Sequence, residues 1–306
     1  MLDAHQLNVF LMAAETLNFT KAAQQLHMSQ PSVSQHIKSL ETYLDVPLFL
    51  RSGRSIKLTD SGVALVPLAR EFVNQSIQIE EEMVSLSGKI HGHLKIGCCT
   101  TPGKYVFPIM LSEFHHEYPN VTLECQVAPQ AKALESLSLG ELHFTLASLV
   151  DKPDLNIKFY KFMCDPVVLI TPLDHSWAKR DEINVEELVE ADFILREKSS
   201  GTYDAVRESL AQLGFHIEQL RILLTLGNSE AIALAVKEGL GVGFVSMSTV
   251  VNICPDKVAV VKVAGLDICR DIYLARNMLT RVTRAQKAFW NFMRSLEIPI
   301  VEFDIS

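Results

Sequence analysis

The sequence lacks the features that would tie it to a membrane or to export. No apolar run approaches the roughly 20 residues that a membrane-spanning helix needs. The N-terminus shows no charged segment followed by an apolar one, which is the pattern of an export signal. We therefore expect a cytoplasmic protein with no membrane partner.

Signs of catalysis are also missing. No nucleophile stands beside a base at a recognisable spacing, no two carboxylates form a motif, and no glycine-rich loop is suited to phosphate. The absence of these motifs predicts a protein that is not an enzyme and holds no cofactor. An enzyme that uses an α/β crevice, or a solute-binding protein, is the alternative.

Cysteines are few and scattered. The six of them show no Cys-x-x-Cys or Cys/His spacing, so we expect neither a metal site nor, in a cytoplasmic protein, a disulfide framework. Cys98 and Cys99 end a predicted strand, where neighbouring side chains face opposite sides. This predicts one core thiol and one crevice thiol, with a redox sensor as the alternative.

Positive charge is scarce and unevenly placed. The 306 residues should form two or three compact units, and they carry a net charge of −8. Residues 1–60 hold five Lys or Arg and five Asp or Glu, so the whole excess of negative charge lies in residues 61–306. Only the N-terminal part is therefore suited to nucleic acid.

Residues 19–41 predict two helices joined by a tight turn. Thr20 can cap a short helix that buries Ala22 and Ala23, and residues 27–29 leave room only for a turn. Ser29 or Gln30 can cap the next helix, where Pro31 at the first position sacrifices no hydrogen bond. The second helix has apolar residues at three- and four-residue steps, namely Val33, Ile37, Leu40 and Leu44.

The opposite face of this second helix is polar, and a basic hairpin follows it. Arg51, Arg54 and Lys57 come at three-residue steps around a turn at Gly53. A helix-turn-helix with a cationic β-wing places such groups against the DNA major groove and its phosphates. A helical hairpin that only packs is the alternative.

Many positions in this region form a recognisable pattern. They are Leu7, Asn8, Val9, Phe10, Ala13, Glu15, Asn18 to Ala23, Leu26, Ser29 to Ser34, Ile37, Leu40, Glu41, Leu48, Phe49, Arg51, Leu58, Thr59 and Gly62. The pattern resembles the N-terminal signature of LysR-type transcriptional regulators, and the resemblance extends over essentially the whole chain. It implies a winged helix-turn-helix at 1–59 that binds double-stranded promoter DNA. The implied DNA-binding residues are Gln30, Pro31, Ser32, Ser34, Gln35, Lys38, Arg51, Arg54 and Thr59. Among them Ser32, Ser34 and Gln35 would reach base edges, and the cations, Gln30 and Thr59 would hold phosphates.

A long helix should follow the wing. Asp60 and Ser61 can cap it, and it carries more apolar residues than a lone exposed helix would. It is either one helix of a bundle or, as the resemblance implies, a linker helix at 60–88 that pairs with another subunit. The implied assembly is a homodimer or homotetramer.

From Leu94 onward strands alternate with helices, among them a helix over 102–118 and a strand over 165–170, which predicts an open parallel α/β sheet. The resemblance implies a two-subdomain effector domain like a periplasmic binding protein. Its subdomain I would comprise 91–161 and 267–306, and its subdomain II 162–266.

Ligands of such sheets bind beyond the carboxyl ends of strands, beside helix N-termini. The strand ends that predict effector contacts carry Thr100, Thr101, Pro102, Arg196, Ser200, Gly201, Thr202 and Ser229, and the family resemblance implies Gln130 and Ser246 in addition. The Arg196 guanidinium among hydroxyl groups suggests a small anionic effector, although Arg196 could instead pair with Glu197. The stretch from Leu195 to Thr202 resembles the CbbR-like subset of the family, whose effectors are small anionic metabolites. Ser248 stands where many members of the family carry proline, so the sequence departs from the family pattern beside the predicted effector pocket.

Overall fold

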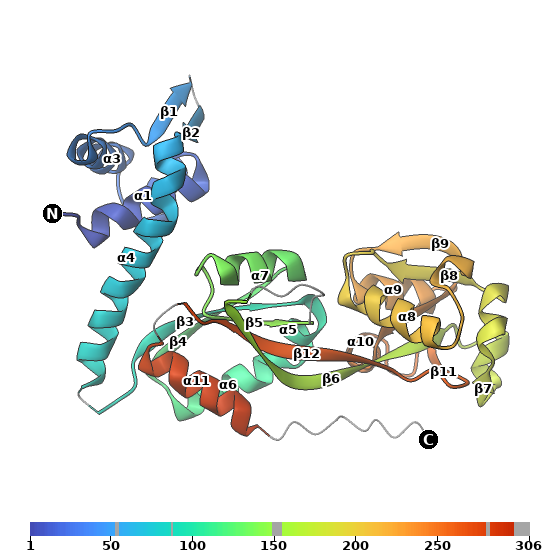
Figure 1. The fold of residues 1–306 in the computed structure, drawn as a ribbon. Helices are drawn as coiled ribbons and strands as arrows, with labels where there is room; N and C mark the ends of the chain where they lie inside the picture. Colours follow the sequence, from blue (N-terminus) through green and yellow to red (C-terminus); the bar gives the residue numbers. More distant parts are fainter. Residues whose placement is uncertain (53–54, 87, 149–154, 280–281, 297–306) are drawn as a thin grey trace. The chain divides into compact units, whose positions relative to one another are not determined.

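The computed structural model describes residues 1–52, 55–86, 88–148, 155–279 and 282–296 (Figure 1). It separates into two units, of which the first comprises Met1–Gly92 and Arg281–Arg284 and the second the remaining residues. Among the described residues, no helix has both the length and the apolar character to cross a membrane.

The first unit is a winged helix-turn-helix followed by a long helix. Its elements are α1 (Ala4–Thr16), α2 (Phe19–Gln25), α3 (Gln30–Leu44), β1 (Phe49–Ser52), β2 (Ser55–Leu58) and α4 (Asp60–Ser85). The two helices, the turn and the hairpin are confirmed. The predicted cap of α2 is wrong: the Asn18 side chain accepts hydrogen bonds from the N–H groups of Thr20 and Lys21, at 2.9 and 3.1 Å. Asn18 is one of the residue types that serve best in this position.

Aromatic packing joins the wing to the helices. The ring of Phe49 lies 5.7 Å from that of Phe10 and 5.4 Å from that of Phe19. The carboxylate of Glu41, near the end of α3, accepts hydrogen bonds from the N–H groups of Leu48 and Phe49, at 2.8 and 3.1 Å. The position of the wing beside α3 is therefore fixed by both packing and hydrogen bonds.

Helix α4 begins where the wing ends. Thr59, and not the predicted Asp60 or Ser61, is its N-cap, and its hydroxyl accepts from the Gly62 N–H at 2.9 Å. A Cβ on Gly62 would lie 2.3 Å from the carbonyl oxygen of Leu48, so only glycine allows this approach. Farther along, α4 exposes large apolar side chains, namely Leu68, Phe72, Ile77, Ile79, Met83 and Val84.

The second unit is built on a ten-stranded sheet whose main path has the order β4-β3-β5-β12-β6-β10-β8-β9. The strands are β3 (Gly92–Cys98), β4 (Val121–Val127), β5 (Phe144–Ala147), β6 (Ile157–Thr171), β7 (Glu182–Ile183), β8 (Asp192–Arg196), β9 (Arg221–Leu226), β10 (Val242–Ser246), β11 (Ala259–Val263) and β12 (Ile268–Asn277). The α-helices are α5 (Thr100–Tyr105), α6 (Phe107–Glu117), α7 (Gln130–Ser138), α8 (Gly201–Gln212), α9 (Ser229–Lys237), α10 (Met247–Ile253) and α11 (Arg284–Ser295). Three short 3₁₀ helices complete the described elements: η1 (Ser176–Lys179), η2 (Val185–Glu190) and η3 (Ile217–Gln219).

Three expectations for this unit need correction. The sheet is mixed, because β12 runs antiparallel to both β5 and β6, and β6 runs antiparallel to β10. The helix predicted over 102–118 is two helices, since Pro108 has no N–H and its ring clashes with a continuing helix. The strand predicted at Asp165–Ile170 is the second half of the 15-residue β6, which runs through both subdomains.

One disulfide is present, although the sequence predicts no disulfide framework. Cys164 on β6 is bonded to Cys269 on β12, 105 residues apart, with a Cα–Cα distance of 5.7 Å. The other cysteines, Cys98, Cys99, Cys125 and Cys254, are free. The pairing follows from strand register, which cysteine spacing in the sequence does not reveal.

Candidate functional site

Helix α3 presents one polar face to solvent. Its Ser29 cap accepts from the Ser32 N–H at 3.2 Å, and Pro31 stands in its first turn. Val33, Ile37 and Leu40 are fully buried against α1 and α2. The turn before α3 depends on His27, which adopts a left-handed conformation with φ of 53°.

The predicted DNA-contacting side chains of α3 lie on its outer side. Gln30, Pro31, Gln35 and Lys38 are exposed, while Ser32 and Ser34 are half-buried. The amide of Gln35 donates to the Ser39 hydroxyl at 3.4 Å, which holds it along the helix. None of these six side chains is packed in the core.

The wing is described only in part. Lys57 on β2 is exposed. Arg54 and the side chain of Arg51 lie outside the described residues, so the structure does not place their charges. The Thr59 hydroxyl donates to the Pro47 carbonyl at 2.7 Å and also accepts from Gly62, so it caps α4 and is poorly suited to the predicted phosphate contact.

In the second unit a buried ion pair links the strands that join the subdomains. Asp165 on β6 lies opposite Arg270 on β12, and the Arg270 guanidinium donates to the Asp165 carboxylate. Their side chains are only 2% and 7% exposed. Burial works to lower the pKa of Arg270, and the charge of Asp165 reverses this, so the pKa is raised. The group therefore keeps its positive charge.

Two predicted effector residues contact this pair. The Ser246 hydroxyl at the end of β10 donates to Asp165 at 2.5 Å, and Arg270 donates to the Thr202 hydroxyl at 3.0 Å. Ser246 and Thr202 are themselves buried, and they supply hydrogen bonds that a carboxylate and a guanidinium need in the protein interior. These hydrogen bonds thus fix the last residue of β10 and the first turn of α8 to β6 and β12.

Arg196 forms a second buried cluster. It donates two hydrogen bonds to its neighbour Glu197, at 2.9 and 2.8 Å, and one to the Ser229 hydroxyl at 3.3 Å. The alternative that Arg196 pairs with Glu197 is confirmed. Burial acts to raise the pKa of Glu197, but the hydrogen bonds from Arg196 outweigh it and hold the pKa below its usual value.

The remaining predicted effector residues have structural partners or restricted surroundings. Thr101 is buried, and the side chains of Thr100 and Pro102 lie outside the described set. The Gln130 side chain accepts from the Ser148 N–H at 2.8 Å. Ser200 caps α8 by accepting from the Tyr203 N–H at 3.1 Å.

Gly201 marks a point where both subdomains approach closely. A Cβ there would lie 2.7 Å from the Ser148 hydroxyl and 3.4 Å from the Cδ of Arg270. Within the described residues, the Ser148 hydroxyl and the Arg270 Nε are buried without a hydrogen-bond partner. Two donors, one following β5 and one on β12, therefore converge beside Gly201.

Polar contacts of Glu230 also connect the two subdomains. Glu230, in the first turn of α9, accepts from the Lys104 ammonium at 2.7 Å and from the Tyr105 hydroxyl at 2.5 Å, both on α5. The hydrogen bond from Lys104, followed by that from Tyr105, lowers the pKa of Glu230. Any movement that separates α5 from α9 has to break these contacts.

The strand pattern predicts one core thiol and one crevice thiol at Cys98 and Cys99, and the structure differs from this prediction. Cys98 and Cys99 are both buried, because β3 ends at Cys98 and the alternation stops there. Burial raises the pKa of Cys98, while the hydrogen bond from the Cys98 thiol lowers the pKa of Cys99.

Sequence reasoning missed Asp165, Arg270 and Ser148. A signal for the first two exists, since each is a charged residue within a stretch rich in apolar residues, and a buried charge requires a partner. The sequence gives no indication of which residue that partner is. Ser148 carries no signal beyond its place after a strand.

Two family models match most of the chain. The family described as LysR substrate binding domain matches residues 87–297, and the lysR family of bacterial regulatory helix-turn-helix proteins matches residues 4–63. The chain belongs to the LysR family of transcriptional regulators. Its winged helix-turn-helix and two-subdomain effector domain are the parts that define this family.

Two relatives and one solved structure resemble this LysR-type regulator. The transcriptional activator CmpR of Synechocystis sp. is 32% identical over 292 residues, which cover 94% of each chain. A RuBisCO operon transcriptional regulator of Acidithiobacillus ferrooxidans is 30% identical and covers 94% of this chain and 92% of its own. The regulatory domain of CcmR from Synechocystis PCC6803, in complex with 2-PG, is 25% identical, with a TM-score of 0.60 and coverage of 66% of this chain and 96% of its own. The resemblance to regulators of RuBisCO operons agrees with the CbbR-like pattern of residues 195–202.

Proposed function

We propose that this LysR-type regulator acts in the cytoplasm, without enzymatic activity, by binding double-stranded promoter DNA through α3 and the wing. The observation that carries this is the orientation of α3, whose polar side chains face solvent while Val33, Ile37 and Leu40 are buried. Ser34 and Gln35 stand where a helix in the major groove would offer them to base edges. Lys38 and Lys57 would contact phosphates.

We further propose that the protein works as a homodimer or homotetramer. The support is the row of large apolar side chains that α4 exposes along much of its length. Such a row favours a matching helix over water. A two-fold dimer would present two α3 helices to a two-fold DNA site.

The crevice is proposed to bind a small anionic metabolite. Support comes from the CcmR domain, whose structure holds 2-PG, and from the two donors that converge at Gly201. Ser148 and Arg270 can each offer an N–H or O–H group to an anion without losing a present contact. The other predicted hydroxyls, those of Thr202, Ser229 and Ser246, lie around the two guanidiniums.

Effector binding would act on DNA through the angle between the subdomains. A ligand shifts such an equilibrium only by as much as its affinity for the two states differs. The contacts of Glu230 with Lys104 and Tyr105 join α9 to α5, and the ion pair of Arg270 with Asp165 joins β12 to β6. A change of the angle between the subdomains would strain both. A ligand that contacts Ser148 and Arg270 together would favour the closed arrangement.

The DNA proposal can be tested with sites selected by the purified protein from random duplexes. Ser34→Ala or Gln35→Ala should change the selected bases with little effect on salt dependence, because base contacts carry sequence information. Lys38→Ala should weaken all sites alike and reduce the salt slope by about 1. Thr42→Ala, exposed near the far end of α3, is the control and should do neither. Unchanged base selection by both Ser34→Ala and Gln35→Ala, together with an unchanged salt slope for Lys38→Ala, would contradict this interface.

The effector proposal can be tested by thermal shift with 2-PG, phosphate and sulfate. An anion that binds the native state should raise the melting temperature. Ser148→Ala should weaken that binding at least about tenfold, since a hydrogen bond to a charged group contributes about 1.5–3 kcal/mol. Ser112→Ala, at an exposed position on α6, should leave it unchanged. Equal loss in both serine variants would place the anion elsewhere.

A further inference from the structure

The two subdomains are joined by a short two-stranded segment. On β12, Tyr273–Arg276 pair with β5 of subdomain I, whereas on β6, Val167–Ile170 pair with β10 of subdomain II. Between these points, residues 163–166 of β6 and 269–272 of β12 pair with one another. We call these eight residues the connector. A two-stranded ribbon has little stability of its own, so the side chains on its two faces determine how readily it bends.

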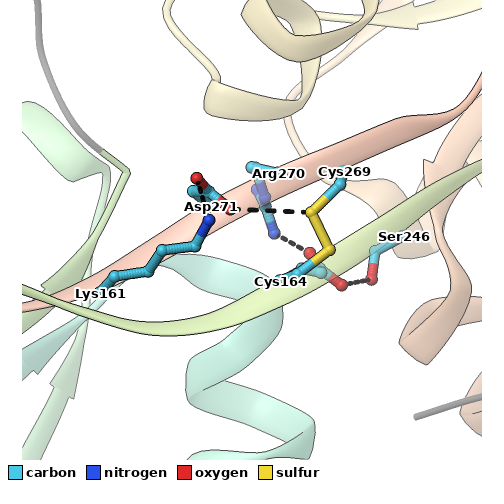
Figure 2. The surroundings of a disulfide bond; sticks show 7 residues. Lys161, Cys164, Ser246, Cys269, Arg270 and Asp271 are labelled. Atoms are coloured by element: carbon cyan, nitrogen blue, oxygen red, sulfur yellow. Dashed lines mark hydrogen bonds and ion pairs between the residues drawn. A yellow bond between two sulfur atoms is a disulfide. The ribbon is translucent and has the colours of Figure 1, made fainter. Parts of the chain in front are cut away.

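The faces of the connector differ in chemistry and in access to water. Successive side chains of a strand point to opposite sides, so Asp165 and Arg270 face one way and Cys164 and Cys269 the other. The ion pair is buried, whereas Cys269 is exposed and Cys164 half-buried. Figure 2 shows the sulfur bridge between the strands, with Lys161 and Asp271 beside it.

The surroundings of the sulfur pair allow exchange with solution thiols. The Cα–Cα distance of 5.7 Å lies within the range of ordinary disulfides, so bond formation needs no large movement of the strands. Asp271 Oδ1 lies 3.7 Å from the Cys269 sulfur, and the Lys161 ammonium, 2.7 Å from the same carboxylate, offsets its charge. An exposed cross-strand sulfur is the kind that thiolates can reach.

We propose that Cys164 and Cys269 form a reversible thiol–disulfide site that sets the stiffness of the connector. In the oxidising direction, the Cys269 thiolate attacks a small-molecule disulfide and releases one thiolate. The Cys164 thiolate then attacks the sulfur of Cys269 in the mixed disulfide and releases the second. Two electrons pass from the protein to the small disulfide, and the two protein protons end on the released thiols. Reduction by a small thiol is the reverse.

The bond would matter because it lies on the connector, next in sequence to both members of the ion pair. A change of subdomain angle requires β6 and β12 to twist or slide against each other between Tyr273 and Val167. A covalent link between these strands restrains that movement on the exposed face, while Asp165 and Arg270 restrain it on the buried face. Oxidation thus adds a second restraint to the connector, whereas in the reduced protein the ion pair restrains it without the disulfide.

The first test is a redox titration of the folded full-length chain in glutathione buffers, with alkylation and mass spectrometry of the trapped cysteines. We expect a bond between Cys164 and Cys269 that forms and breaks reversibly, with a midpoint inside the series of glutathione ratios. Cys125→Ser, which removes the exposed free thiol, should leave the titration unchanged. A bond that resists excess dithiothreitol until the protein unfolds would overturn the proposal. So would two thiols that stay unlinked at the most oxidising ratio.

The second test measures stiffness by amide hydrogen exchange. Reduction, or the double variant Cys164→Ser/Cys269→Ser, should speed exchange within the connector about threefold or more relative to the oxidised protein. In the oxidised Cys125→Ser variant, amide exchange in the connector should be as slow as in the oxidised native protein. Equal connector rates in both redox states would overturn the stiffening. Neither test uses DNA or an effector, so their outcomes do not depend on whether the proposed function is correct.

Discussion

Replacing Asp165 by alanine removes the carboxylate on which the centre of the effector unit depends. The Arg270 guanidinium would stay buried, at 7% exposure, without its charged partner. The buried Ser246 hydroxyl would lose the acceptor that it now contacts at 2.5 Å. An unpartnered buried charge and an unpartnered buried hydroxyl both destabilise the native state relative to the unfolded chain.

Breaking a buried ion pair by removing one partner costs about 3–5 kcal/mol. A domain of about 150–250 residues loses about 2–4 °C in melting temperature for each kcal/mol. The effector unit falls in this size range, so Asp165→Ala should lower its melting temperature by roughly 6–20 °C. The winged helix-turn-helix should keep its own transition, because the change lies in the other unit.

Differential scanning calorimetry of the full chain would measure this shift. The matched control is Glu135→Ala, which breaks a surface pair with Lys132 whose side chains are 59% and 60% exposed. Such pairs contribute at most about 1 kcal/mol. The double variant Asp165→Val/Arg270→Met should recover much of the loss, since apolar groups can replace a buried pair at little cost. A shift for Asp165→Ala no larger than the control's would refute the importance of this pair.

Three further changes have defined outcomes. Gly62→Ala should destabilise the first unit by about 1–3 kcal/mol, because its Cβ would meet the Leu48 carbonyl oxygen at 2.3 Å; thermal unfolding followed by circular dichroism measures this. Ser29→Ala should cost about 1 kcal/mol in the same assay through loss of the α3 cap, whereas Ser39→Ala on the exposed face should cost little. Burial lowers the pKa of His143 to about 4, below the unfolded value of about 6.5. The unfolded chain therefore takes up a proton that the native state refuses, so stability is full above pH about 6.5 and falls towards pH 4, by up to about 3 kcal/mol; His143→Gln should remove this part of the slope in denaturant titrations.

The DNA-binding unit was predictable because its signals are local. Ser29, Pro31 and the spacing of Val33, Ile37 and Leu40 lie within a dozen residues, and each follows from helix geometry alone. The errors were also local and small. Asn18 and Thr59 cap α2 and α4 in place of their neighbours, because several adjacent side chains can accept the same hydrogen bonds.

The centre of the effector unit was not predictable, because it depends on strand register. Asp165 and Arg270 are 105 residues apart, as are Cys164 and Cys269, and only the antiparallel pairing of β6 with β12 brings them together. A shift of one residue would turn the ion pair outward and the sulfurs inward. Local patterns identify both strands without fixing their alignment.

The charge balance of the crevice leads to one further expectation. Arg270 and Arg196 each donate to a carboxylate, so an anion that takes over these same N–H groups must displace the carboxylate. The Glu197 side chain is 37% exposed, whereas that of Asp165 is 2% exposed. A displaced Glu197 regains water, and a displaced Asp165 does not, so Arg196 is the more accessible guanidinium.

Glu197→Gln should therefore strengthen anion binding at Arg196. The variant keeps the shape of the side chain and removes the competing charge, a contact of the kind that contributes about 1.5–3 kcal/mol. Binding should tighten about tenfold, measured by titration calorimetry with the anion that gives the largest thermal shift. Glu187→Gln, at the surface pair with Arg180, is the control and should change nothing. If Glu197→Gln bound the anion no more tightly than the native protein, Arg196 would not be its binding group, and the donors beside Gly201 would have to hold it without displacing a carboxylate.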